Sequence, residues 1–175
     1  MIHIQKFGKL LLLAVIMTLT QSVSAEEEKI AGKLVYSELG GPGVLMSVNF
    51  DSRFKCNERL GLGFRAGVGF DIGEFGMKQN IQTYYTIPVG LNYVLGKSNS
   101  NHTFEVGAGV TFLTREVVLF VSDKYRAGYA IGHLNFMYRF MPVNGGFSFR
   151  IGLAPVIGTA GEFFPMVAVS IGYVF

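Results

Sequence analysis

His133 is the residue that most invites a catalytic interpretation, because an imidazole can act as general base for a hydroxyl nucleophile. Asn135 follows two positions later, so the two side chains share one face if this segment is a strand. Ser148 could supply the hydroxyl, but Arg150 lies two positions beyond it, in a run of small and charged residues typical of a buried polar surface. We therefore expect His133 to be a hydrogen-bonded interior residue, and we predict no catalytic site.

Cofactor and metal sites are disfavoured by sequence context. The glycines between Gly61 and Gly69 are as closely spaced as those of a dinucleotide-binding loop. Such a loop joins a strand to a helix, however, whereas these glycines alternate with larger residues along one strand. The single cysteine, Cys56, is far in sequence from His102 and His133, so no metal-ligand spacing is present. We expect neither a cofactor nor a metal.

Residues 1–25 have the composition of an export signal: two lysines without an acidic residue, an apolar run over Leu10–Leu19, and small residues before position 26. The apolar run is too short to cross a bilayer as a helix. We predict cleavage after Ala25 and one mature domain over residues 26–175. That domain carries 13 basic and 12 acidic residues. Because these charges nearly balance, we predict no nucleic-acid partner.

Apolar residues alternate with small or polar ones through the rest of the chain, and a period of two is the pattern of β-strands. No apolar stretch after Ala25 approaches the roughly 20 residues of a membrane helix. In the clearest run, Phe163, Val167, Ile171 and Phe175 share one face. Eight strands are predicted, at Leu34–Gly40, Val44–Asp51, Leu60–Phe70, Tyr85–Leu95, Phe104–Phe112, His133–Phe140, Phe147–Pro155 and Phe163–Phe175.

The two faces of these strands differ in size and charge. One face carries Phe, Tyr, Ile and Leu at nearly every position, and the other carries Gly, Ala and Ser interrupted by single charges. Eight strands enclose an interior only just wide enough for side chains, which argues against a lipocalin-like barrel with the bulky face inside. A soluble exterior would also carry many Lys and Glu residues. We therefore predict an all-β fold, an eight-stranded antiparallel up-and-down transmembrane β-barrel with its aromatic face toward lipid.

The charges within the predicted strands lie on the small-residue face, which points inward in this barrel. Because an unpaired charge is costly to bury, the arginines and acids must pair with one another. We expect a packed, ion-paired interior rather than an open channel. With His133, this interior polar set is Glu38, Asp51, Arg53, Arg65, Glu105, His133, Arg139 and Arg150.

Short and long connections alternate along the chain, as in outer-membrane barrels with short periplasmic turns and longer external loops. Two further external connections, near Pro42 and at Gly158–Gly161, are themselves short. Pro88 lies within a predicted strand, where proline removes a ladder hydrogen bond, so we predict a local bulge there. The short connections are Lys55–Glu58, Gly96–Asn101 and Pro142–Gly146, and the longer ones are Ile72–Asn80 and Glu116–Tyr125.

Three segments carry a family resemblance: residues 86–93 (TIPVGLNY), 104–109 (FEVGAG) and 170–175 (SIGYVF). They resemble the small outer-membrane β-barrels of Gram-negative bacteria, the porin-like and OmpA-like barrel domains, especially Bacteroidetes-type members. The resemblance implies a monomer in the outer membrane, surrounded by lipid and lipopolysaccharide. It also implies a transient partner, the barrel-assembly machinery, which would recognise the terminal pattern Val169, Ile171, Tyr173 and Phe175.

The resemblance specifies architecture more strongly than activity. We expect a structural or surface-interaction role without catalysis. One alternative is a lipid A-modifying enzyme of the deacylase or acyltransferase kind, although no His-x-Ser-Asn motif like that of the deacylases is present. The other alternative is a narrow solute pore.

Deletion of Phe175 should lower assembly, because it removes the last aromatic residue of the terminal pattern. The measurement is the amount of folded protein in the outer-membrane fraction relative to total protein. An unchanged amount would argue against a signal role for this residue.

Overall fold

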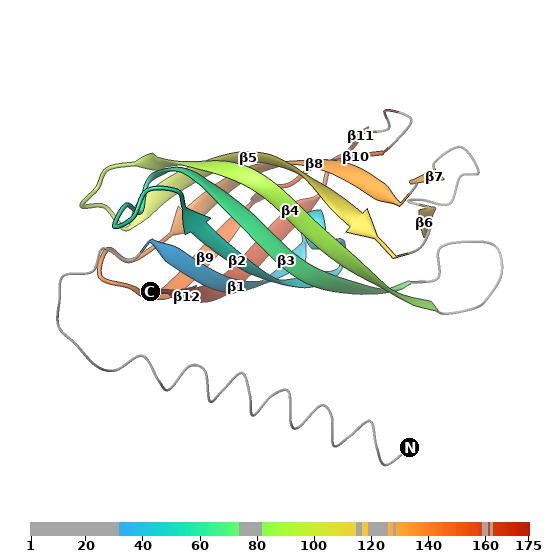
Figure 1. Ribbon diagram of the computed structural model, residues 1–175, viewed down its shortest axis with the longest axis horizontal. Coiled ribbons are helices and arrows are strands. Elements are labelled where there is room, and N and C mark those ends of the chain that lie inside the picture. The colour runs from blue at the N-terminus through green and yellow to red at the C-terminus, as the bar shows by residue number, and fades with distance from the viewer. Residues whose placement is uncertain are drawn as a thin grey trace, which may run out of the picture.

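The computed structural model describes residues 32–73, 82–114, 117–118, 126–127, 129–158, 161 and 163–175. Within these residues the predicted alternation produces eight long strands that pair antiparallel with their chain neighbours (Figure 1). Pairing of the last of them with the first, and of β8 with β9, closes the sheet into a barrel. The wall strands are β1 (Lys33–Gly40), β2 (Met46–Arg53), β3 (Gly61–Gly73), β4 (Gln82–Gly96), β5 (His102–Leu113), β8 (Ala130–Phe140), β9 (Gly146–Leu153) and β12 (Val167–Val174).

The predicted all-β fold with eight barrel strands is confirmed, and most strand ends agree to within three residues. One additional pair joins β6 (Val117–Val118), inside the predicted loop Glu116–Tyr125, to β7 (Arg126–Ala127), directly after it; most of that loop lies outside the described residues. The predicted signal peptide falls outside the described residues, as does most of the predicted loop at 72–80. No helix in the described ranges is both long and apolar enough to span a membrane.

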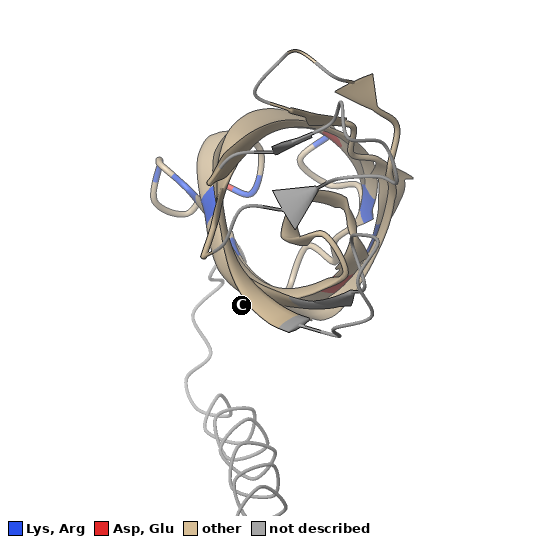
Figure 2. Ribbon diagram, turned by 90° about the vertical axis from the view of Figure 1, so that its right-hand side faces the viewer, with Lys and Arg blue, Asp and Glu red and all other residues tan. Residues whose placement is uncertain are grey.

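The first and last wall strands close the barrel through their backbones. Leu34 pairs with Val174 at one end of this ladder, and Gly40 pairs with Ala168 at the other. Two further hydrogen bonds extend it, from Lys33 N to Phe175 O at 3.1 Å and from Phe175 N to Lys33 O at 2.9 Å. The end view in Figure 2 shows the resulting closed ring.

The two ends of the barrel differ. The turn end, as we call it, holds the short connections 54–60, 97–101 and 141–145 and the C-terminal residue. The loop end holds the other connections, including 41–45 and the one between Ile157 and Phe163. This arrangement follows from up-and-down topology, because every second connection must lie at the same end.

Prolines interrupt two neighbouring wall strands near the loop end. Ala154-Pro155 separates β9 from the short β10 (Val156–Ile157), and Pro165-Met166 separates β11 (Phe163–Phe164) from β12. The pairings on either side keep one register, with Leu153 opposite Val167 and Val156 opposite Phe164. The interruption therefore removes ladder bonds without inserting a residue, since proline has no N–H to donate.

The bulge predicted at Pro88 is wrong. Ala66 pairs with Val89 and Gly69 pairs with Thr86, so the same number of residues separates the two pairs on each strand. Pro88 still pairs with Thr111 of β5. The proline is accommodated by omitting two ladder pairs on its β3 side, and the strand stays in register.

The β1–β2 connection turns into the barrel instead of protruding outward. Its 3-10 turn η1 (Gly41–Gly43) consists of three buried residues, among them Pro42. Gly40 and Gly41 have φ values of 73° and 67°, in the left-handed region that glycine tolerates best. The sequence places Pro42 correctly in a connection, but it does not show that this connection fills the interior at the loop end.

Gly152→Ala should destabilise the barrel, because a Cβ at this position would overlap the carbonyl oxygen of Phe136. We expect a loss of about 1–3 kcal/mol in the free energy of unfolding, typical of overpacking. Gly132→Ala is the matched control, since the nearest atom to its Cβ would be 3.6 Å away, at Ile157. Urea titration followed by circular dichroism in detergent would measure both. Equal stability of the two variants would contradict the steric argument.

Candidate functional site

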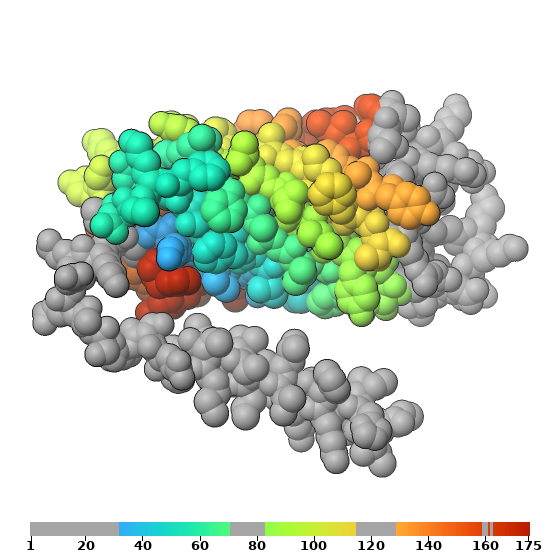
Figure 3. Space-filling view, viewed as in Figure 1, coloured from blue at the N-terminus to red at the C-terminus, as the bar shows by residue number. Residues whose placement is uncertain are grey.

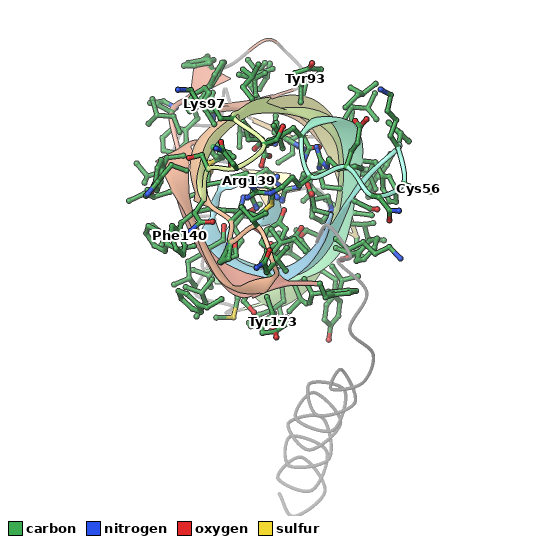
Figure 4. All side chains as sticks on the ribbon, turned by 90° about the vertical axis from the view of Figure 1, so that its left-hand side faces the viewer. Cys56, Tyr93, Lys97, Arg139, Phe140 and Tyr173 are labelled. Carbon is green, nitrogen blue, oxygen red and sulfur yellow. The ribbon has the colours of Figure 1, made fainter. Side chains whose placement is uncertain are left out.

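The outer surface of the barrel is apolar. Exposed fractions reach 64% for Val68, 54% for Leu91 and 55% for Ile171, all pointing away from the interior. Tyr93, Phe140 and Tyr173 project outward from the ring in the view onto the turn end, whereas Arg139 lies inside it (Figure 4). Strands β2 to β5 present one continuous side of this surface (Figure 3). Among outward-facing positions of the described wall strands, Lys33 at the start of β1 is the only charged residue.

The interior contains a continuous chain of ion pairs, which we call the charge network. It runs Arg53–Asp51–Arg139–Glu105–Arg150–Glu38–Arg65, with alternating sign. The closest contacts are 2.5 Å for Arg53–Asp51, 2.7 Å for Arg139–Glu105 and 2.8 Å for Arg65–Glu38. The side chains of the network are at most 2% exposed. All seven predicted interior charges are therefore brought together.

Neutral polar groups complete the carboxylate contacts. The Asn92 side-chain amide donates to Asp51, and its carbonyl oxygen accepts from Arg53 Nη2 at 2.7 Å. Ser170 Oγ donates to Glu38 Oε2 at 3.0 Å. These contacts matter because a buried carboxylate retains several acceptor positions after one ion pair is formed.

Tyr36 packs against the cationic part of the network. Its ring lies 4.2 Å from the guanidinium carbon of Arg150 and 5.6 Å from that of Arg65. The four arginines outnumber the three acids by one, and an aromatic face attracts a guanidinium electrostatically. Tyr36, Asn92 and Ser170 were not singled out from the sequence. Their inward positions on the strands were the only sequence feature that could have indicated contact with the charges.

Arg59 closes the turn end. It is 3% exposed although it lies in the β2–β3 connection. Its guanidinium donates to the carbonyl oxygens of Ser98 at 3.0 Å and Ser100 at 2.7 Å, and also to that of Met141. One side chain thus joins all three short connections. This role is not predictable from the sequence, because an arginine in a turn is ordinarily solvated.

The loop end of the interior is closed by η1 and by apolar residues. Thr86 Oγ1 donates to Gly43 O at 3.1 Å, and Thr111 Oγ1 donates to Pro42 O at 2.8 Å. Val44, which follows η1 in the same connection, packs against a buried cluster. The cluster consists of Tyr84, Leu113, Ile131 and Val156.

His133 belongs to this closed interior and is 1% exposed. Its Nδ1 lies 3.2 Å from Thr111 Oγ1. His133 pairs with Val156. Ser148 precedes Val156 by eight positions, and this separation corresponds to roughly 26 Å along a strand. Ser148 Oγ instead donates to Phe140 O at 2.8 Å. The structure therefore does not bring the candidate base and hydroxyl together.

The remaining candidates lie on the outer surface. Ile171, Tyr173 and Phe175 are about half exposed, and Val169 is half-buried on the same face. His102 Nδ1 contacts Tyr138 Oη at 2.6 Å near the turn end, and Cys56 is an exposed free thiol. In the described part of the chain, no three His, Cys, Asp or Glu residues are grouped to hold a metal ion.

Comparison with known proteins supports the architecture. No protein-family model and no curated protein matches this sequence. The N-terminal β-barrel domain of Pseudomonas aeruginosa OprF has the same fold. Its crystal structure superposes with a TM-score of 0.56 at 12% sequence identity, covering 84% of this chain and 98% of that domain. At this identity the likeness establishes the barrel fold alone. It does not distinguish a Bacteroidetes-type member.

Glu105→Gln should strongly destabilise the barrel, because Glu105 pairs with both Arg139 and Arg150 in the interior. We expect a loss of about 3–5 kcal/mol, the usual cost of breaking a buried ion pair. Glu58→Gln is the matched control, because its pair with Lys55 is solvent-exposed. The same urea titration measures both, and a Glu105→Gln barrel as stable as the control would refute a structural role for the network.

Proposed function

We propose that this protein is an integral outer-membrane β-barrel with a structural or surface-interaction role and no catalytic or conducting activity. The observation that carries the proposal is the combination of an apolar exterior with an interior filled by the charge network. A soluble protein with so extended an exposed apolar surface would associate or aggregate, whereas a bilayer covers it.

Aromatic residues at both ends of the barrel support a membrane-spanning orientation. Tyr93 and Tyr173 lie toward the turn end, while Tyr85 and Phe163 lie toward the loop end, and all are exposed. Rings of aromatic residues at the two interfaces flank the apolar band of outer-membrane barrels. Within the described residues, the exposed lysines are Lys33, Lys55 and Lys97, and all three lie at the turn end. We assign this end to the periplasm, as its short connections suggest.

A filled interior supports a non-conducting role. Arg59 lies across one end, the charge network occupies the middle, and η1 lies across the other. An eight-stranded barrel has little interior width beyond its own side chains. Conduction would require displacement of several ion-paired groups.

The partners follow from the same proposal. The exposed apolar surface would contact membrane lipid, including lipopolysaccharide at the loop end. The barrel-assembly machinery would bind the terminal strand through the outward face that ends at Phe175. We assign no lipid A-modifying activity, because His133 points into the closed interior rather than toward the lipid-facing rim.

Insertion and conductance test this proposal together. The purified protein should float with lipid vesicles and should migrate differently on gels before and after heating, as folded barrels do. In planar bilayers the inserted protein should give no steady conductance. A protein that stays soluble without detergent would refute the membrane assignment, and steady conductance from the inserted monomer would refute the filled interior.

Lipid analysis separates the structural role from catalysis. Cells with and without the gene should have the same lipid A acyl pattern by mass spectrometry. A difference that is abolished by His133→Ala would replace the structural proposal with an enzymatic one.

A further inference from the structure

The β1–β2 connection contains a strained backbone position. Val44, which directly follows η1, has φ 73° and ψ −85°, the geometry of a rare and strained turn. Among the described residues other than glycine, only Val44 and Asn57 have a positive φ. Asparagine tolerates the left-handed region, whereas the branched side chain of valine is strongly disfavoured there. The inward fold of η1 therefore has a conformational cost that other interactions must offset.

Few interactions offset this cost. The residues of η1 are Gly41, Pro42 and Gly43, which have no polar side chain and cannot form an ion pair. Two hydroxyl groups hold η1 through its carbonyl oxygens, because Thr86 donates to Gly43 and Thr111 donates to Pro42. The Val44 side chain adds an apolar contact with the buried cluster at the loop end. Each of these hydrogen bonds stabilises η1 only modestly, since water replaces it when the groups are exposed.

His133 is linked to η1 through Thr111 and has an unmet hydrogen-bonding capacity. Thr111 has one hydroxyl hydrogen, which it donates to Pro42 O. Its oxygen must therefore accept from Nδ1 of His133, 3.2 Å away. Nδ1 then carries the ring proton, and Nε2 carries a lone pair. Nε2 is buried without a hydrogen-bond partner, and a buried acceptor without a donor destabilises the closed arrangement.

Displacement of η1 from the interior would relieve these unfavourable features together. The Val44 backbone could adopt an ordinary conformation, and solvent could reach Nε2 of His133. Glu38 would be uncovered as well, because its Oε1 lies 3.6 Å from the position of a Cβ on Gly41. A buried charge gains from hydration, so this exposure also favours displacement. The closed arrangement is thus opposed by backbone strain, an unpaired acceptor and a desolvated carboxylate.

We propose that η1 is a displaceable cap, which leaves the interior in a minor open state and returns to it. Gly40 and Val44 are the hinges of the cap, and the bond from Gly40 N to Leu45 O, 2.9 Å long, closes its base. The open state uncovers His133 and Glu38 at the loop end alone. The other ion pairs and Arg59 still fill the interior, so no conducting path results. The inference goes beyond the proposed function and applies to the protein in detergent as well as in a membrane.

Diethyl pyrocarbonate labelling of the detergent-solubilised protein, followed by peptide mass spectrometry, measures the open state. The reagent acylates an unprotonated imidazole nitrogen, so Nε2 of His133 reacts only when the cap is displaced. His102 is exposed and reports the activity of the reagent in the same sample. His133 should react much faster than the barrel unfolds globally, because only the cap has to move.

Two variants of Val44 isolate the backbone strain. Val44→Gly and Val44→Ala both remove the apolar contact, but only glycine adopts a positive φ without strain. His133 should therefore react about tenfold more slowly in Val44→Gly than in Val44→Ala.

Two variants of buried threonines locate the opening. Thr86→Val removes a hydrogen bond to η1, so His133 should react several-fold faster. Thr103→Val is the matched control, because Thr103 is also buried and donates to a backbone carbonyl oxygen, that of Arg139, near the turn end. The control should leave the reaction rate of His133 unchanged.

Four results would overturn the cap. A His133 reaction no faster than global unfolding would show that η1 does not leave the interior. Equal rates in Val44→Gly and Val44→Ala, or failure of only the glycine variant to fold, would show that strain does not oppose the closed state. Equal acceleration by Thr86→Val and Thr103→Val would show that His133 is reached through general loosening of the barrel.

Discussion

Mutual pairing of inward-pointing charges is the interaction on which the rest of this barrel depends. The charge network draws side chains from β1, β2, β3, β5, β8 and β9, and Asn92 and Ser170 add contacts from β4 and β12. A slip of one residue in any strand would move its side chains to the opposite face. In the six strands that carry network charges, such a slip would also move an arginine or acid to the apolar outer surface and leave its partner unmatched. The network therefore specifies register as well as filling space.

Glycines make room for the polar side chains of the interior. Gly107 and Gly109 of β5 lie beside Asn135 and His133 of β8, and larger residues there would meet those side chains. An eight-stranded barrel has little spare width, so long arginine side chains are compatible only with small neighbours. The apolar residues excluded from the interior by this constraint are the ones that form the outer surface. The narrow interior thus determines which residues face inward and which face outward.

The fold was largely predictable because it follows from a period of two. Each wall strand shows the alternation locally, and a charge such as Arg65 or Glu105 on the small-residue face was enough to place it inward. The pairing partners were not predictable, because they depend on barrel tilt and side-chain reach rather than on local pattern. Arg59 and η1 escaped prediction for a related reason: nothing in a turn sequence indicates whether it points into the interior. The bulge predicted at Pro88 is absent because a missing ladder bond does not require an inserted residue.

Closure between β1 and β12 joins residues from opposite ends of the described chain. Every strand of a barrel wall has a neighbour on both sides only when all strands are present. Removal of one terminal strand therefore leaves two strands with an unpaired edge. An incomplete chain would therefore present two unpaired rows of N–H and C=O groups, which in hydrocarbon could not be satisfied by water. For this topology, insertion of a partial wall is strongly unfavourable. β12, near the C-terminus, has to pair with β1, near the start of the described residues, before the wall is complete.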